Sequence, residues 1–345
     1  MTRTTDRREF LQQSAAATLA SSGLVLSGFG AAGIVDSSVY AADASATKTD
    51  LPIIDTHQHL WDLNKFRLPW LADAPALKRS YVTKDYLAAV AGLNIAKSVY
   101  MEVDVTPEQQ VEEAEHLIAI CQDPKNLTVG AVISGRPASD QFKKYITQFR
   151  GNKLIKGVRQ VLHGGSTPAG TCLAKPYVAG VQLLGELGMS FDLCMRPTEL
   201  ADGAKLADQC PDTRLIVDHC GNADPKAFSP SKQRAQDEKP THEVDPWKRD
   251  IELLAKRPNV ICKISGIVAR ARAQAWSAED LAPIVNHCLD SFGPERVVFG
   301  SDWPVCTLVA SLKEWVTALR AIIATRPVDE QKKLLSENAR RFYAV

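Results

Sequence analysis

The chain has 345 residues, a formal net charge of +1, and 45% hydrophobic and 23% charged residues. This composition is typical of a soluble globular protein. Because a charge so close to zero offers no broad basic surface to phosphates, it argues against nucleic acid as the partner.

The N-terminal segment has the pattern of an export signal. Arg7 and Arg8 form a pair before a weakly polar run of small residues and leucine at residues 14–35. This order is typical of a twin-arginine signal. The alternatives are a cytoplasmic helix or a membrane anchor, but glycine and serine interrupt the run too often for a good membrane-spanning helix. We predict a signal over residues 1–41, a linker over residues 42–50, and a periplasmic or extracellular mature protein without a stable membrane span.

The eight cysteines would suggest disulfides in an exported protein. Twin-arginine substrates fold before export, however, and four cysteines fall at or just after apparent strands, where buried free thiols are common. These four are Cys194, Cys220, Cys262 and Cys306. We therefore expect no essential disulfide.

From residue 50 onward, apolar runs of strand length alternate with amphipathic helical stretches. Strands are predicted at residues 53–57, 97–103, 127–133, 154–161, 190–194, 213–218, 260–264 and 296–300. Helices are predicted at residues 84–91, 107–121, 139–149, 177–187, 199–209, 246–256, 278–291 and 311–324, with a closing helix at 328–345. The alternation indicates parallel βα units and predicts a single-domain α/β fold, a (β/α)8 TIM barrel over residues 51–345.

Two connections are unusually long. Residues 60–80 carry Trp61, Phe66 and Trp70, and residues 221–245 are polar and charged. Loops of this length in a compact domain are usually functional or disordered. Since both follow strands, both belong to the end of the barrel where active sites form.

Polar side chains stand at the C-terminal end of every predicted strand. In chain order they are His57 and His59, Glu102, Arg136, Arg159 and His163, Arg196, His219, Lys263, and Asp302. Because the carboxyl ends of parallel strands meet at one end of a barrel, this pattern predicts a polar reaction chamber.

His57 and His59 lie two residues apart on a strand, so their side chains point the same way. They can converge on a divalent ion or on a polar substrate group. Asp302 is the natural general base, and the loop formed by Trp303 and Pro304 argues against the alternative role of a helix cap. His219 is interpreted as polarising a carbonyl or binding an ion, the alternative being a core histidine.

Several cations point to the substrate. Arg136, Arg159, Arg196 and Lys263 together favour an anionic or oxygen-rich small molecule, although each also has a structural interpretation. Glu102 is interpreted as an extra metal ligand or as a balance to this positive charge. The three remaining histidines are predicted to be structural or to face solvent: His116, His242 and His287.

These residues occur in motifs that resemble one known family. The motifs are IDTHQHLWD at 54–62, GVR at 157–159, SFDL at 190–193, VDHCG at 217–221, CKISG at 262–266 and FGSDWP at 299–304. Together they resemble the lactonase branch of the amidohydrolase superfamily, which includes sugar-acid lactonases and pyrone-dicarboxylate lactonase. The resemblance spans residues 52–344.

The resemblance implies a (β/α)8 barrel in which His57, His59 and Asp302 build the active site and His219 contacts the substrate carbonyl or a metal. Many superfamily members hold metal with a carboxylated lysine on strand four and a histidine on strand five. This chain has neither residue at those strand ends. The comparison therefore argues against a binuclear centre and leaves open one zinc or manganese ion, or none.

The resulting prediction is a hydrolase that opens the lactone of a sugar acid or related carboxylate, with water activated by Asp302. The predicted substrate-binding residues are Arg159, His163, Lys263, Arg136, Trp61 and Trp70, and the predicted metal ligands, where a metal is bound, are His57, His59, Glu102 and Asp302. Three alternatives stay open: amide hydrolysis, non-oxidative decarboxylation, and an exported sugar-acid binding protein without turnover. The sequence also leaves a homo-oligomer open.

Overall fold

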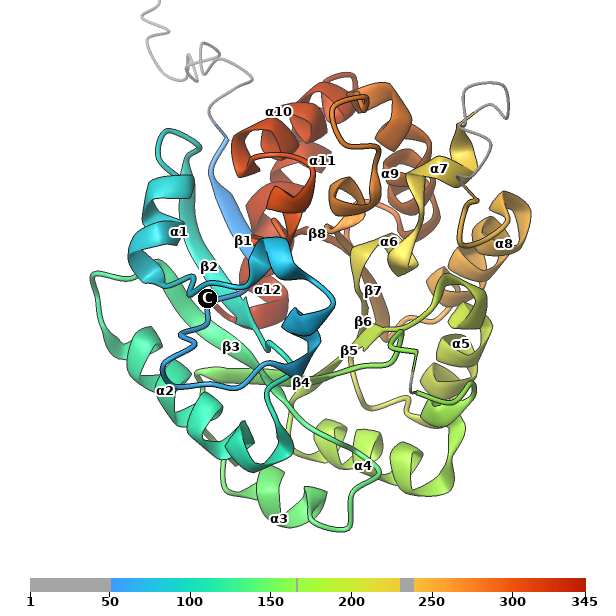
Figure 1. The fold of residues 1–345 in the computed structure, drawn as a ribbon. Coiled ribbons are helices and arrows are strands. Elements are labelled where there is room, and N and C mark those ends of the chain that lie inside the picture. Colours follow the sequence, from blue (N-terminus) through green and yellow to red (C-terminus); the bar gives the residue numbers. More distant parts are fainter. Residues whose placement is uncertain (1–50, 166, 230–238) are drawn as a thin grey trace, which may run out of the picture. The chain divides into compact units, whose positions relative to one another are not determined.

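The computed structural model describes residues 51–165, 167–229 and 239–345. Eight parallel strands follow one another around a sheet in chain order, β1 to β8, and helices cover its outer face (Figure 1). The strands are β1 (Ile53–Gln58), β2 (Ile95–Met101), β3 (Thr128–Ser134), β4 (Ile155–Val161), β5 (Ser190–Cys194), β6 (Leu215–Val217), β7 (Val260–Ile264) and β8 (Val297–Phe299). The predicted TIM barrel is confirmed.

The principal helices lie between the strands, as the sequence pattern predicted. They are α1 (Thr83–Ala89), α2 (Gln110–Gln122), α3 (Phe142–Thr147), α4 (Lys175–Glu186), α5 (Leu200–Gln209), α8 (Val244–Ala255), α9 (Ala278–Phe292) and α10 (Leu312–Ile323). No helix of the described chain is long and apolar enough to cross a membrane. The predicted signal and linker, residues 1–41 and 42–50, lie outside the described residues, so export stays a prediction.

Three segments differ from the sequence prediction. Where the sequence predicted a loop from residue 221, the described chain has a short left-handed turn, labelled α6 (His219–Asn222), and a short helix, α7 (Pro225–Phe228). Strand β6 begins only at Leu215, because Thr213 belongs to the preceding turn and its hydroxyl donates to the Val181 carbonyl. The single closing helix is instead α11 (Val328–Lys332), a π-helical turn and α12 (Asn338–Tyr343).

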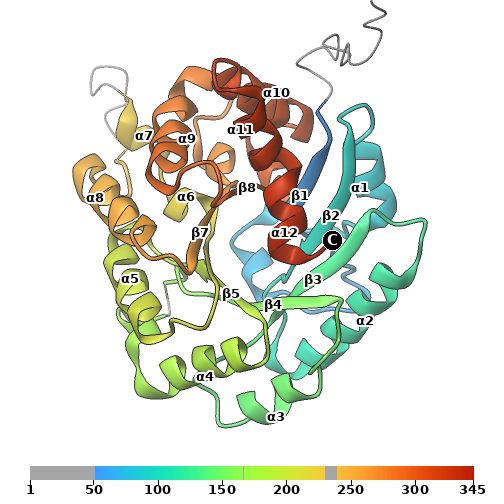
Figure 2. The ribbon, with the colours of Figure 1, turned by 180° about the vertical axis from the view of Figure 1, so that it is seen from behind.

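The two ends of the barrel are covered differently. Apolar side chains inside the barrel form one cluster with Ala339 and Tyr343 of α12. Asn338 of α12 donates to the carbonyls of Pro294 and Val297 at the start of β8, so α12 closes the N-terminal end (Figure 2). The connection from β1 to α1 crosses the opposite end, where the strands finish (Figure 1).

The barrel closes between β8 and β1 through few contacts. Gln58 and Trp303 form an isolated parallel bridge. The amide of Asp302 donates to the His57 carbonyl at 2.8 Å, and the amide of His59 donates to the Trp303 carbonyl at 2.8 Å. We call these contacts the seam. They place two chain segments almost 250 residues apart side by side, at the end of the barrel where active sites form.

Asp55 supports the seam from within the protein. Its carboxylate is fully buried and accepts hydrogen bonds from the Ser301 amide (2.8 Å), the Ser301 hydroxyl (2.6 Å) and the Tyr86 hydroxyl (2.7 Å). Burial raises the pKa of Asp55, and the hydrogen bonds from Ser301 and Tyr86 oppose this rise. One side chain thus ties β1 to the loop after β8 and to α1.

We expect Asp55→Ala to destabilise the fold by about 3 kcal/mol, because it leaves several buried donors without an acceptor. Tyr86→Phe removes only one of these donors and should cost about 1 kcal/mol. Urea unfolding followed by fluorescence measures both values. Equal losses in the two variants would contradict a seam held chiefly by Asp55.

Candidate active site

The strand β1 is irregular where its histidines begin. Its register with β2 shifts between Asp55 and Gln58. His57 and His59 nevertheless converge, with ring centroids 4.9 Å apart. Both face Asp302, whose Oδ1 lies 3.3 Å from His59 Nε2 and 3.7 Å from His57 Nε2. All three residues are buried, so the contacts form in a site largely shielded from water.

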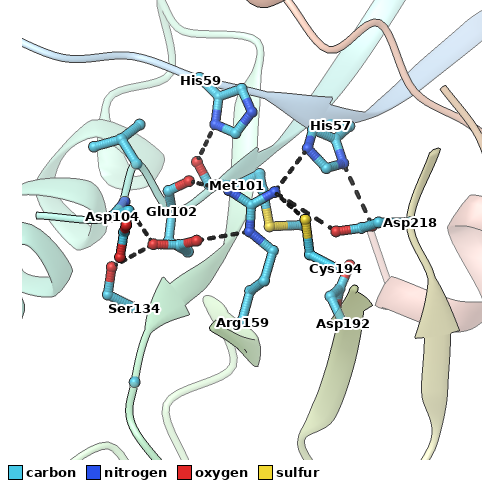
Figure 3. Close-up of polar contacts among 12 residues, drawn as sticks. His57, His59, Met101, Glu102, Asp104, Ser134, Arg159, Asp192, Cys194 and Asp218 are labelled. Atoms are coloured by element: carbon cyan, nitrogen blue, oxygen red, sulfur yellow. Dashed lines mark hydrogen bonds and ion pairs between the residues drawn. The ribbon is translucent and has the colours of Figure 1, made fainter. Parts of the chain in front are cut away.

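The outer partners of the two rings determine which nitrogen carries the proton. His59 Nδ1 lies 2.9 Å from the carbonyl of Met101, which can only accept, so Nδ1 carries a proton (Figure 3). His57 Nδ1 faces Asp218 Oδ1 at 3.5 Å, and the Arg159 guanidinium donates to His57 Nε2 at 3.2 Å. A neutral His57 is therefore unprotonated at Nε2, where its lone pair accepts from Arg159, and His59 Nε2 lies within hydrogen-bonding distance of Asp302 Oδ1.

Burial also sets the charge of His57. Desolvation lowers the pKa of His57 well below its ordinary value, and Lys263 and His219 lower it further, while Asp218 opposes them. His57 is therefore neutral at physiological pH.

His219 reaches the same space from the loop after β6. Four consecutive residues from His219 to Asn222 have positive φ, which turns the chain sharply and directs the imidazole toward His57, with ring centroids 4.4 Å apart. His219 Nδ1 lies 2.9 Å from the Ser265 hydroxyl. Gly266 makes room for this ring, since a Cβ there would lie 2.2 Å from His219 Nδ1. Burial lowers the pKa of His219, with Asp302 and Asp218 opposing the change.

Asp302 occupies an uncommon backbone conformation. Its φ is +56°, and its amide is held by the His57 carbonyl across the seam. Only a few per cent of residues other than glycine adopt positive φ, and such residues cluster at active sites. The turn directs the carboxylate to the two histidines rather than to the helix that follows.

Glu102 is buried beside Arg159 and pairs with it. Arg159 Nε lies 2.6 Å from Glu102 Oε1, while Glu102 Oε2 accepts from the Ser134 hydroxyl at 2.7 Å and the Asp104 amide at 2.6 Å (Figure 3). Burial acts to raise the pKa of Glu102, but Arg159 outweighs it and the pKa is lowered. Glu102 is also a predicted metal ligand; in the structure both of its oxygens have partners within the protein, and neither candidate ligand group contains it. Its other predicted role, to balance positive charge, agrees with the pairing.

Lys263 is buried beside two acids. Its side chain is fully buried, and its Nζ lies 2.7 Å from Asp192 Oδ2 and 3.1 Å from Asp218 Oδ1. Lys263 is predicted to contact substrate, and in the structure its ammonium lies next to two carboxylates.

The remaining predicted binding residues divide between rim and core. Arg136 pairs with Asp104 at 2.6 Å and stays partly exposed, and His163 is exposed. Trp70 is half-buried, and its indole donates to the Val103 carbonyl just beyond β2. Trp61, which is also a predicted substrate-binding residue, is only 2% exposed and packs against Trp70.

Two groups of side chains in the described chain could hold a metal ion, each with ligand atoms within 4.8 Å of one another: His57, His59 and Asp302, and His57, Asp218 and His219. In the second group Asp218 is already close to Lys263 and Arg159. In the first, the Nδ1 of each histidine faces an outer acceptor, which is the usual arrangement behind a metal-binding imidazole. The first group therefore fits one divalent ion better.

Sequence reasoning missed two acids that organise the site, Asp192 and Asp218. Both occur within or directly after fully buried strands, in SFDLC and LIVDH. A carboxylate inside a buried strand needs a cation, and that requirement was the available signal.

Comparison with known proteins places this geometry in context. The sequence pattern of the amidohydrolase family matches residues 54–345, as the motifs predicted. An uncharacterized protein of Sinorhizobium fredii, y4mH, is 28% identical to the chain, with 86% of this chain and 100% of that protein covered. An L-fucono-1,5-lactonase of Burkholderia multivorans is 26% identical, with 85% and 96% covered.

A solved structure has the same architecture. An amidohydrolase from Burkholderia multivorans with bound HEPES has a TM-score of 0.73 and 25% identity, with 85% of this chain and 99% of that chain covered. A second crystal form of an amidohydrolase from that organism, with bound zinc, has a TM-score of 0.72 and 24% identity, with the same shares covered.

Glu113 of α2 is a second buried carboxyl group near Glu102, and its titration makes the stability of the folded state depend on pH. It accepts from the amides of Val103 and Ser134 and from the Tyr100 hydroxyl. Burial, and next the charge of Glu102, raise the pKa of Glu113 from 4.5 to about 7. Between these two values the folded chain retains a proton that the unfolded chain releases, so Glu113 makes the folded state less stable as the pH rises.

We expect Glu113→Gln to gain stability relative to wild type by about 3 kcal/mol as the pH rises from about 4.5 to about 8, because glutamine has no proton to lose. Urea unfolding across this pH range measures the difference. Glu112→Gln, on the exposed face of the same helix, is the matched control and should show no such trend. A pH-independent difference for Glu113→Gln would contradict the prediction.

Proposed function

The chain belongs to the amidohydrolase family, and from this premise we propose that it is a lactonase that opens the ring of a sugar-acid lactone or a related carboxylic ester. The observation that carries the proposal is a buried carboxylate, Asp302, which faces the Nε2 atoms of His57 and His59 where the strands of the barrel end. Relatives named as lactonases support the choice of substrate class.

In the proposed reaction, Asp302 accepts a proton from water, and the oxygen of that water attacks the lactone carbonyl carbon. The ester bond in the ring then breaks. The leaving oxygen takes the proton from Asp302, so the open chain carries a hydroxyl group and a carboxylic acid, and the acid releases its proton to solvent to become a carboxylate. Placing an acid–base group next to the reacting carbonyl is the main contribution of Asp302.

His219 is the proposed donor to the developing oxyanion. When the Ser265 hydroxyl donates a hydrogen bond to His219 Nδ1, the neutral ring carries its proton on Nε2. That N–H group can then donate to the carbonyl oxygen of the substrate. His57 and His59 place their Nε2 atoms beside Asp302, where they are suited to hold an ion or to orient the water.

One divalent ion fits this arrangement, and His57, His59 and Asp302 would hold it. When bound, zinc or manganese would polarise the carbonyl and lower the pKa of a bound water. Imidazole and carboxylate ligands are compatible with both metals. The proposal is for a single ion, since Asp218 in the second candidate group is already close to Lys263 and Arg159.

Residues at the rim are proposed to hold the rest of the substrate. Arg136, His163 and Trp70 are the predicted binding residues that remain partly or largely accessible. A guanidinium, an imidazole and an indole can bind carboxylate or hydroxyl groups and cover an apolar ring face. Arg159, which is 5% exposed, is proposed to orient His57 in addition to any contact with substrate.

The central test is a pH-indicator assay of the purified chain on a panel of aldonolactones. We expect turnover by wild type and a loss of about 10²- to 10⁴-fold in Asp302→Asn, which cannot accept the proton. Asp140→Asn, at an exposed position, is the matched control and should retain full activity.

Other outcomes would redirect the proposal. Turnover of amides or aromatic carboxylates without lactone opening would assign another reaction of the superfamily. Binding of sugar acids without any turnover, unchanged in Asp302→Asn, would assign a binding protein. Either result contradicts the lactonase.

A second prediction concerns the metal. We expect zinc or manganese to bind at one equivalent per chain. His59→Asn removes a direct ligand and should weaken this binding by more than about 100-fold, because loss of an outer partner alone costs up to about 100-fold. Isothermal titration with each metal measures the affinity. His116→Asn on helix α2 is the control, since this histidine lies in neither ligand group. Lactone turnover that chelator leaves unchanged would contradict a role for the ion.

A further inference from the structure

The four cations that pointed to an anionic or oxygen-rich substrate all have carboxylate partners within the protein. The pairs, with the distances between their charged atoms, are Arg136 with Asp104 (2.6 Å), Arg159 with Glu102 (2.6 Å), Arg196 with Glu199 (2.9 Å) and Lys263 with Asp192 (2.7 Å). A protein carboxylate competes with a substrate carboxylate for the same donors and repels it. These contacts therefore favour the oxygen-rich alternative without a negative charge.

Only one of these four cations is both accessible and open to a further ligand. Arg159 and Lys263 are buried. The guanidinium of Arg196 is held by Glu199 on one nitrogen and by two backbone carbonyls, those of Gly164 and Thr167, on the other. This leaves Arg136, whose side chain is 25% exposed, as the member of the four that a substrate can reach.

Asp104 occupies this arginine from the neighbouring strand end. Its Oδ1 accepts from Arg136 Nη2 at 2.6 Å, while Arg136 Nη1 donates to the Gly135 carbonyl at 3.2 Å. Asp104 has a φ of +51°, and its amide donates to Glu102 Oε2 at 2.6 Å. Aspartate and asparagine tolerate this left-handed conformation better than most residues. The turn after β2 thus places an acid directly on the accessible arginine that follows β3.

Together the two side chains offer both kinds of hydrogen-bonding group. Within the described chain, Asp104 Oδ2 has no hydrogen-bond partner, so it can accept, and the remaining N–H groups of Arg136 can donate. A hydroxyl group both donates and accepts, whereas a carboxylate only accepts. The pair therefore suits neighbouring hydroxyl groups of a polyol. The half-buried Trp70 lies on the same side, since its indole donates to the carbonyl of Val103, the residue before Asp104.

Arg270 is a further cation, in the loop after β7. Its Nη1 donates to Asn222 Oδ1 at 3.3 Å, and its charge interacts with that of Asp224. Strand β7 lies across the barrel from β2 and β3, so Arg270 and Asp104 belong to different sides of the site (Figure 1). Substitutions at the two positions can therefore be compared as separate sources of charge selection.

We propose that Asp104 determines the charge specificity of the site: by occupying Arg136, it selects an uncharged, polyhydroxylated lactone and disfavours a lactone that carries a further carboxylate. This inference deepens the proposed lactonase function and rests on it. Asp104 and Arg136 bind hydroxyl groups of the substrate, while Asp302 carries out the proton transfer.

Two matched lactones test the proposal. The five-membered lactone of an aldonic acid and that of the corresponding aldaric acid differ only at the far end, which carries a hydroxymethyl group in the first and a carboxylate in the second. We expect kcat/KM of the wild type to be at least about tenfold higher for the uncharged lactone, because a like charge beside the bound carboxylate is unfavourable. The pH-indicator assay measures both values.

The key variant is Asp104→Asn, which keeps the shape and tolerates the positive φ but removes the negative charge. Arg136 can then pair with the substrate carboxylate, so kcat/KM for the anionic lactone should rise by about 10- to 100-fold, chiefly through KM. For the uncharged lactone it should fall by about three- to tenfold, because an amide oxygen is a weaker acceptor than a carboxylate. Adding Arg136→Gln should cancel the gain on the anionic lactone.

The matched control is Glu199→Gln, which breaks the corresponding ion pair of Arg196. The two carbonyls still hold that guanidinium, so the ratio of the two kcat/KM values should not change. A folded Asp104→Asn variant with an unchanged ratio would overturn the proposal, and so would a wild type that prefers the anionic lactone. Because partly exposed ion pairs contribute little to stability, Asp104→Asn should fold; where it does not, the wild-type ratio still decides.

Binding separates this inference from the proposed function. Isothermal titration with the two matching lactams, in which an N–H group replaces the ring oxygen, needs no lactone turnover. We expect the uncharged lactam to bind the wild type at least about tenfold more tightly. This result without turnover of any lactone would refute the lactonase and retain the charge selection. Equal or tighter binding of the charged lactam, or a preference altered by Arg270→Gln and unaltered by Asp104→Asn, would overturn the role of Asp104.

Discussion

The seam between β8 and β1 is the constraint on which the rest of the site depends. The hydrogen bond from the Asp302 amide to the His57 carbonyl closes the barrel and also fixes the backbone on both sides of the reacting centre. Asp55 binds the Ser301 amide and hydroxyl just behind it. Closure of the fold and placement of the proposed acid–base residue therefore depend on the same contacts, and a loosened seam would separate Asp302 from its histidines.

Buried ion pairs are the second feature on which the site depends. Glu102 pairs with Arg159, and Asp192 and Asp218 enclose Lys263. Such pairs are weak evidence for stability, because desolvation of two ions offsets most of their attraction. Their value here lies in orientation: each pair ends in a contact with His57, one through Arg159 and the other through Asp218.

The sequence predicted the barrel well because apolar periodicity and strand ends are local signals. It also identified His57, His59, His219 and Asp302, which the structure brings together. It could not determine which polar side chains face substrate. Lys263 and Glu102 stand at strand ends like the others, but their partners lie on strands distant in sequence. Trp61 likewise lies in a loop rich in aromatic residues, and only tertiary packing shows that its ring is enclosed.

There is a physical reason why some of these polar residues face the site while others are buried in ion pairs. A charged residue at a strand end meets either solvent and substrate or an opposite charge from an adjacent strand, and register decides which. Strands β5, β6 and β7 pair without a register shift, and Asp192 of β5 and Asp218 after β6 both lie close to Lys263 of β7. Between β1 and β2 the register is broken, and there the histidines are free to turn toward Asp302.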